Sequence, residues 1–81
     1  MRVKVRLFAR LRDIAGAPEL ERDVAHGATA ATVWRDLVRD FPDLGAYERS
    51  LSVAINADYA RMGDTVHYGD EVAFLPPVSG G

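Results

Sequence analysis

The sequence closes with the stretch Glu71-Val72-Ala73-Phe74-Leu75-Pro76-Pro77-Val78-Ser79-Gly80-Gly81. Residues 71–75 predict a strand, in which Val72 and Phe74 share one face. The two prolines that follow fix φ and lack amide donors, so sheet pairing is expected to end there. The stretch therefore divides the chain into a folded domain, residues 1–75, and an extended tail, residues 76–81, which can reach about 20 Å.

The tail finishes on Gly80 and Gly81. Glycine has no side chain, so the terminal carbonyl is open to approach from every side. A terminal carboxyl group ionises at about pH 3.5, so at neutral pH it is a small nucleophile that a nucleotide can activate. Chain ends are often floppy, and Gly-Gly alone is ordinary floppy composition. The Pro-Pro joint and the strand before it favour a functional tail.

Upstream, the sequence alternates strand and helix patterns. Residues 2–8 alternate basic with apolar side chains and residues 19–25 alternate acidic with apolar ones, which predicts a hairpin of two strands. Phe8 falls on the polar side of the first alternation, so it is either packed at the edge of the core or an exposed aromatic. Between these strands, residues 9–15 predict a short helix that ends at Gly16.

Residues 30–41 give the one clear helix, because apolar side chains recur there at helical spacing. Thr29 is its expected N-cap, and Pro42 disfavours the helical conformation in Phe41. Further expected elements are a helical turn at 43–49 and strands at 51–55, 59–62 and 71–75. The predicted fold class is α+β, a mixed sheet with one main helix packed on one face.

The apolar side chains that share one face within each periodic element are expected to form the core. They are Val3, Val5, Leu7, Leu20, Val24, Val33, Trp34, Leu37, Phe41, Val53, Ile55 and Val72.

The composition bounds the functions that the chain can have. Its 81 residues, 48% of them hydrophobic, suit one small domain with a modest core. The absence of cysteine excludes disulfides, thiolate metal sites and cysteine nucleophiles. Lys4 is the single lysine, and the arginines are spread among acidic residues, so no nucleic-acid partner is expected. The apolar runs are too short for a bilayer and no signal peptide is recognisable, which predicts a cytoplasmic protein without membrane contact.

Within the domain, the sequence offers no convincing catalytic set. His26 and His67 are too isolated to predict a metal site. The alternating acids of residues 19–25 are better explained as a solvated strand face than as metal ligands or an acid/base pair. No glycine-rich loop precedes the helix, so no bound cofactor is expected. The reactive group with a structural rationale is the carboxylate of Gly81.

Three segments resemble the small, sulfur-carrying subunit of molybdopterin synthase. They are Phe8-Ala9-Arg10-Leu11-Arg12, Val53-Ala54-Ile55-Asn56 and the stretch from Gly69 to Gly81. The resemblance implies a ubiquitin-like β-grasp fold. It also implies that an activating enzyme adenylates Gly81 with ATP and that the glycine then becomes a thiocarboxylate.

In this family the tail enters the large subunit, where the sulfur passes to a pterin precursor of the molybdenum cofactor. The resemblance implies that role for Pro76, Pro77, Val78, Ser79 and Gly80, within a heterotetramer. It also implies that Phe8, Tyr59 and Leu75 make apolar contacts with the large subunit and that Arg12 makes a polar contact beside them. Two positions depart from the family pattern: Ala57 stands where many relatives have glycine, and Tyr68 where many have an acidic residue.

Three other functions remain open. A sulfur carrier for thiazole synthesis or RNA thiolation would share the fold and the Gly-Gly end, although the Pro-Pro-Val-Ser-Gly-Gly ending favours molybdopterin. A protein modifier would form isopeptide bonds, and a single lysine, Lys4, argues against chains of the modifier itself. The last alternative is an interaction domain with an inert tail.

Overall fold

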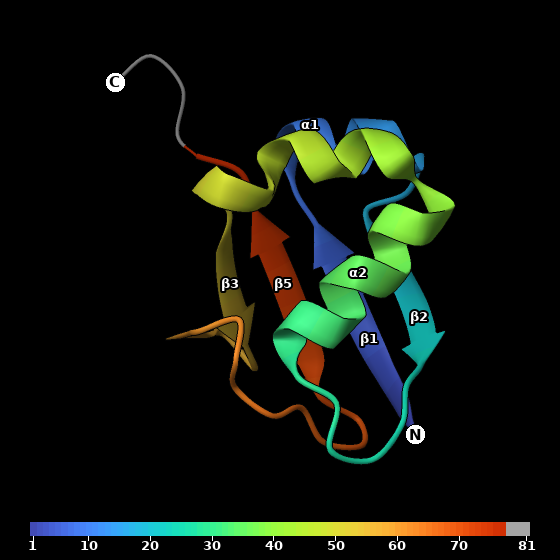
Figure 1. Ribbon diagram of the computed structural model, residues 1–81, viewed down its shortest axis with the longest axis vertical. Coiled ribbons are helices and arrows are strands. Elements are labelled where there is room, and N and C mark those ends of the chain that lie inside the picture. Colours follow the sequence, from blue (N-terminus) through green and yellow to red (C-terminus); the bar gives the residue numbers. More distant parts are fainter. Residues whose placement is uncertain (78–81) are drawn as a thin grey trace.

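The computed structural model describes residues 1–77, which form an α+β fold with a mixed sheet covered on one face by a helix (Figure 1). In chain order the elements are β1 (Arg2–Leu7), α1 (Ala9–Ala15), β2 (Glu19–Asp23), α2 (Ala30–Asp40), the 3₁₀ helix η1 (Pro42–Ser50), β3 (Ser52–Ile55), β4 (Asp58–Ala60) and β5 (Glu71–Leu75). This is the ubiquitin-like β-grasp arrangement, and the predicted fold class is confirmed.

The strand order in the described sheet is β2-β1-β5-β3-β4. The first and last strands, β1 and β5, lie side by side at its centre and run parallel, whereas the other neighbouring pairs are antiparallel (Figure 1). Because Leu7 is paired with Phe74, the carboxyl ends of β1 and β5 meet at one edge of the sheet. Phe8 and Leu75 therefore follow directly from neighbouring strands at the same end of the molecule.

Helix α2 begins where the sequence predicted and ends at Asp40, one residue before the predicted end. The hydroxyl of Thr29 accepts a hydrogen bond from the backbone N–H of Thr32 at 3.3 Å, and the Thr32 hydroxyl accepts one from the Thr29 N–H, which completes a capping box. Phe41 is the C-cap, and Pro42 opens η1, which extends one residue beyond the predicted turn at each end. One face of α2 packs on the sheet through Trp34, whose ring centroid lies 5.1 Å from that of Phe74.

Most of the predicted core is buried, but three members are only half-buried: Leu20, Phe41 and Ile55. Leu20 lies on the edge strand β2, Phe41 caps a helix end, and Ile55 closes β3 before a turn, so each has neighbours on fewer sides. Several fully buried side chains were not in the predicted core. They are Leu11, Leu44, Val66 and Phe74.

The predicted strands were slightly too long at their ends. β1 ends at Leu7 because Phe8, which has extended φ and ψ, is already the N-cap of α1. β2 stops at Asp23, two residues early, although Val24 is still buried. β4 begins at Asp58, one residue before its predicted start, because a turn of two residues joins it to β3, and it ends at Ala60, two residues before its predicted end.

No helix within residues 1–77 has the length and apolar character that a bilayer span requires.

Candidate functional site

The sheet face that points away from α2 is divided into a charged half and an apolar half. Alternate residues of β1 and β2 place basic and acidic side chains on this face. Alternate residues of β3, β4 and β5 place alanine, tyrosine and leucine there, together with Ser52 and Glu71. The boundary between the two halves runs along the parallel pair β1 and β5.

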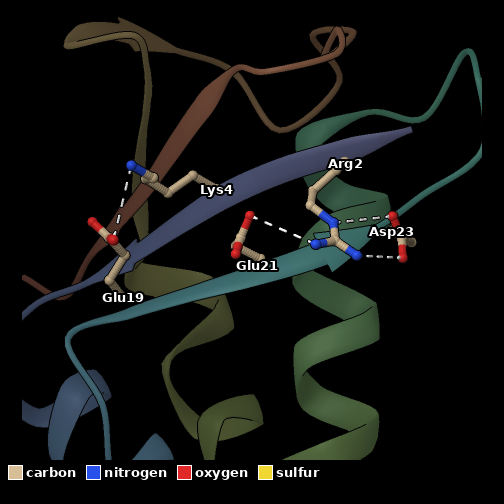
Figure 2. Close-up of polar contacts among 5 residues, drawn as sticks. All are labelled: Arg2, Lys4, Glu19, Glu21 and Asp23. Carbon is tan, nitrogen blue, oxygen red and sulfur yellow. Dashed lines mark hydrogen bonds and ion pairs between the residues drawn. The ribbon is translucent and has the colours of Figure 1, made fainter.

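The charged half is a set of exposed ion pairs between β1 and β2 (Figure 2). Arg2 is 3.4 Å from Asp23 and 3.9 Å from Glu21, and Lys4 is 3.8 Å from Glu19. The alternating acids are therefore exposed, as the sequence predicted, and each faces a base of the neighbouring strand. Exposed pairs of this kind contribute about 0–1 kcal/mol each. Residues 1–77 contain no cluster of side chains that could hold a metal ion.

The apolar half contains a depression of about 260 Å³, here named the apolar groove. It is lined by Arg6, Phe8, Ala54, Ala57, Tyr59, Glu71, Ala73 and Leu75. Ala54 and Ala73 lie directly opposite each other on β3 and β5 and form a floor of small side chains. Tyr59, 83% exposed on the edge strand β4, pairs with Ala54 across the sheet and forms one wall.

The groove brings together the three apolar residues that were predicted to contact a partner. Phe8 follows β1, Tyr59 comes from β4, and Leu75 ends β5. Phe8 and Leu75 are half-buried. Phe8 is thus partly packed at the edge of the core and partly exposed, which are the two alternatives that the sequence left open. The predicted polar contact, Arg12, lies on the exposed surface of α1 and does not line the groove. Its role in a partner contact stays a prediction.

The backbone beside Phe8 is strained. Ala9 has a φ of 51°, in the left-handed region that costs an L-residue about 1–2 kcal/mol. This conformation turns the chain abruptly from β1 into α1, while the N–H of Leu11 bonds back to the Phe8 carbonyl at 3.1 Å. Strain of this kind is frequent beside functional surfaces. Here it accompanies the turn that leaves the Phe8 ring at the mouth of the groove.

The tail starts at the edge of the groove. The last paired residue of β5 is Leu75, opposite Ser52, and Pro76 and Pro77 lie outside the strand as predicted. The predicted tail residues Val78, Ser79 and Gly80, and Gly81 with its predicted reactive carboxylate, lie outside the described residues.

At the opposite end of β5, a network of hydrogen bonds joins two turns. The amide of Asn56 donates to the Asp70 carboxylate at 2.9 Å, and the backbone N–H of Glu71 donates to the Asn56 side-chain oxygen at 2.9 Å. The backbone N–H of His67 donates to Asp70 at 2.8 Å. The bond from Asn56 is the main reason why the pKa of Asp70 lies below its usual value.

The sequence predicts that Asn56 and Asp70 lie in turns, and both belong to segments of the family resemblance, but it assigns no contact between them. The signal that could have revealed one is their chemistry, because Asn and Asp in turns bond readily to neighbouring backbone groups. His67 Nδ1 lies 3.7 Å from Asp70, and the His67 carbonyl accepts from the Asp70 N–H at 3.0 Å, which closes the turn of residues 67–70.

The model of the ThiS family matches residues 5–81. This chain belongs to the ThiS family. Among curated relatives, the molybdopterin synthase sulfur carrier subunit of Arabidopsis thaliana is 37% identical over 98% of this chain and 82% of that protein. The subunit of the same name from Haemophilus influenzae is 39% identical over 98% of this chain and 99% of its own.

Among solved structures, SAMP1 from Haloferax volcanii superimposes on this ThiS-family chain with a TM-score of 0.86. The two sequences are 32% identical, and the match covers 100% of both chains. This neighbour supports the β-grasp assignment over the whole described fold.

Proposed function

We infer that this ThiS-family protein is the sulfur carrier subunit of a molybdopterin synthase. One structural observation carries the proposal: the apolar groove lies at the root of the tail, because Leu75 lines the groove and is the last residue before the tail. A carrier needs a docking surface next to the segment that delivers its cargo. The relatives from Arabidopsis thaliana and Haemophilus influenzae are named molybdopterin synthase sulfur carrier subunits, which supports delivery of the sulfur to molybdopterin synthase.

The proposed chemistry takes place on Gly81 inside partner proteins. An activating enzyme consumes ATP: the Gly81 carboxylate attacks the α-phosphate, pyrophosphate leaves and an acyl-adenylate forms. A sulfur donor then displaces AMP, which leaves a thiocarboxylate. ATP is needed because a free carboxylate is a poor acyl donor, and two terminal glycines let both partners reach the carbonyl without a steric clash.

In the second half of the cycle the carrier docks on the large subunit. The apolar groove covers a complementary apolar surface there, and the tail extends into the active site of the large subunit. The sulfur atom passes to the pterin precursor, and attack of water on the acyl group restores the carboxylate. Exposed apolar side chains gathered on one face, above all Tyr59, are typical of a protein interface. The proposed assembly is a heterotetramer.

A second candidate function is protein modification, and the likeness to SAMP1 favours it, since a curated relative of this chain from the same organism is named small archaeal modifier protein 1. In that case Gly81 would form an isopeptide bond with an amine of a target. Within this chain Lys4 is the single lysine, and its ammonium group is paired with Glu19.

Mass spectrometry of the protein purified from its own cells tests the two proposals. A sulfur carrier gives a species in which one oxygen is replaced by sulfur, and this species disappears when the activating enzyme is deleted. A modifier gives remnants of Gly-Gly on lysines of other proteins after digestion. Detection of the unmodified acid alone, with the activating enzyme present and the cells making molybdenum cofactor, would contradict both.

A further inference from the structure

Arg6 stands on the boundary between the charged half of the sheet face and the apolar groove. Its guanidinium carbon lies 5.3 Å from the centroid of the Phe8 ring, and its Nη1 lies 3.5 Å from Oε1 of Glu71. Both of these partners line the groove. The Arg6 side chain is 46% exposed, so it can reach a molecule that covers the groove.

The strand register shows that this orientation is specific to Arg6. Arg6 lies directly opposite Glu19 on β2, and Lys4 lies directly opposite Glu21. Lys4 nevertheless pairs with Glu19, the acid that faces Arg6 (Figure 2). The guanidinium of Arg6 instead contacts Glu71 on β5 and the Phe8 ring, away from β2. Arg2 and Lys4 therefore form ion pairs between β1 and β2, whereas Arg6 contacts residues that line the groove.

Covering the groove with an apolar surface would remove water from this guanidinium. The group has five N–H donors, and among residues 1–77 only Nη1 has a hydrogen-bond acceptor, at the long distance of 3.5 Å. Its Nε and Nη2 edge has no partner within the described part of the chain. Buried donors without acceptors oppose binding, so a partner that docks here must bring an acceptor.

A carboxylate fits this edge best. The Nε and Nη2 groups of arginine form a planar fork that matches the two oxygens of a carboxylate. Glu71 is 38% exposed and engages the other side of the guanidinium, so a second carboxylate would complete an acid-base-acid arrangement across the rim of the groove.

We propose that Arg6 is a specificity-determining residue of the docking face and that it binds a carboxylate of the large subunit beside an apolar side chain inserted in the groove. This inference rests on the proposed function, because it takes the large subunit as the occupant. It adds the chemistry of the partner surface: one apolar anchor flanked by an acidic residue.

The test is calorimetric titration of the full-length variants into the large subunit of the same organism. Arg6→Gln removes the charge and keeps hydrogen-bonding capacity, and we expect it to weaken binding about tenfold. Arg6→Glu adds repulsion and should weaken binding about a hundredfold. Arg2→Glu is the matched control, because Arg2 lies on the same strand and the same face but pairs with Asp23 outside the groove. The affinity of this variant for the large subunit should stay within about twofold of the wild-type value.

Salt dependence separates a direct contact from an effect on folding. The wild-type dissociation constant should rise with ionic strength, and this rise should be smaller for Arg6→Gln. Melting temperatures of all variants check that they are folded. Equal affinities of Arg6→Gln and the wild type, or an unchanged salt dependence, would overturn the inference.

Tyr59→Asp separates this inference from the proposed function. Tyr59 is exposed, so the substitution leaves the fold intact while it places a charge in the groove. If Tyr59→Asp abolishes binding to the large subunit and Arg6→Gln leaves the affinity unchanged, only the inference about Arg6 is rejected, and the groove remains the docking face. If Tyr59→Asp binds the large subunit with wild-type affinity, the groove is not the docking face. That result rejects both the proposed docking of the groove on the large subunit and the role of Arg6.

Discussion

The side chain of Asn56 ties the β3–β4 turn to the loop before β5 by donating to the carboxylate of Asp70 at 2.9 Å. The same Asn56 side chain accepts from the backbone N–H of Glu71, and the backbone N–H of Asn56 donates to the Glu71 carbonyl at 2.8 Å. These bonds anchor the start of β5, the strand that ends at the tail. The strand that leads into the tail is thus fixed at its start by contacts between two turns.

Replacing Asp70 with alanine should lower the free energy of unfolding by about 1–3 kcal/mol, because Asn56 and the His67 N–H lose their acceptor. Urea denaturation measures the change. Asp13→Ala is a matched control, since Asp13 is an exposed carboxylate on α1. Equal midpoints for the Asp70 variant and the wild type would show that the network does not stabilise the fold.

The same contact predicts a pH dependence. The hydrogen bond from Asn56 lowers the folded-state pKa of Asp70 below its unfolded value of about 3.9. The stabilisation is therefore complete above that unfolded value and is lost as the pH falls through the lower, folded-state pKa. We expect the stability gap between the wild type and Asp70→Asn to narrow as the pH drops below about 4. A gap that stays constant to pH values well below that range would contradict the assignment.

Glycine at position 57 should stabilise the protein by about 1 kcal/mol. Asn56 and Ala57 have φ values of 52° and 72° in the two-residue turn between β3 and β4, and such turns favour glycine at the second position. Thermal unfolding of Ala57→Gly should show a melting temperature a few degrees higher, by about 4–8 °C per kcal/mol. Ala46→Gly, at an exposed site without positive φ, should give no such gain.

Replacing Phe8 with aspartate should weaken assembly with the large subunit by more than about tenfold, because a charge then occupies the mouth of the apolar groove. Since Phe8 is half-buried, we expect the isolated domain to remain folded with reduced stability. Tyr68→Asp is the control, as Tyr68 is an exposed aromatic that does not line the groove. Unfolding of the Phe8 variant would place this residue in the core instead.

Adding one alanine after Gly81 should abolish sulfur loading. The extension moves the carboxylate about 3.5 Å and puts a peptide carbonyl in its place. Reactive geometry is lost over about 1 Å, so thiocarboxylate formation with activating enzyme, ATP and a sulfur donor should fall by far more than about tenfold. The melting temperature should hardly change, because the buried core lies within residues 3–74. Normal loading of the extended chain would refute the carrier proposal.

Local chemistry determined much of this protein without reference to tertiary contacts. Thr29 and Pro42 set the bounds of α2, because capping and proline geometry act within a few residues. Strand alternation located β1, β2 and β5, since side-chain period depends on the local backbone alone. The chemistry of the Gly-Gly end also led to the prediction that Gly81 is the reactive residue, which stays a prediction.

Tertiary structure decided which of these elements meet. Parallel pairing of β1 with β5 joins segments from the two ends of the chain, and this pairing places Phe8 beside Leu75 and orients Arg6 toward Glu71. Val66 is fully buried although it belongs to no periodic element, because the loop before β5 bonds to the start of α2 through the Val66 N–H and the Ala28 carbonyl at 2.9 Å. Such contacts depend on how distant segments exclude water together, and no local sequence pattern encodes that.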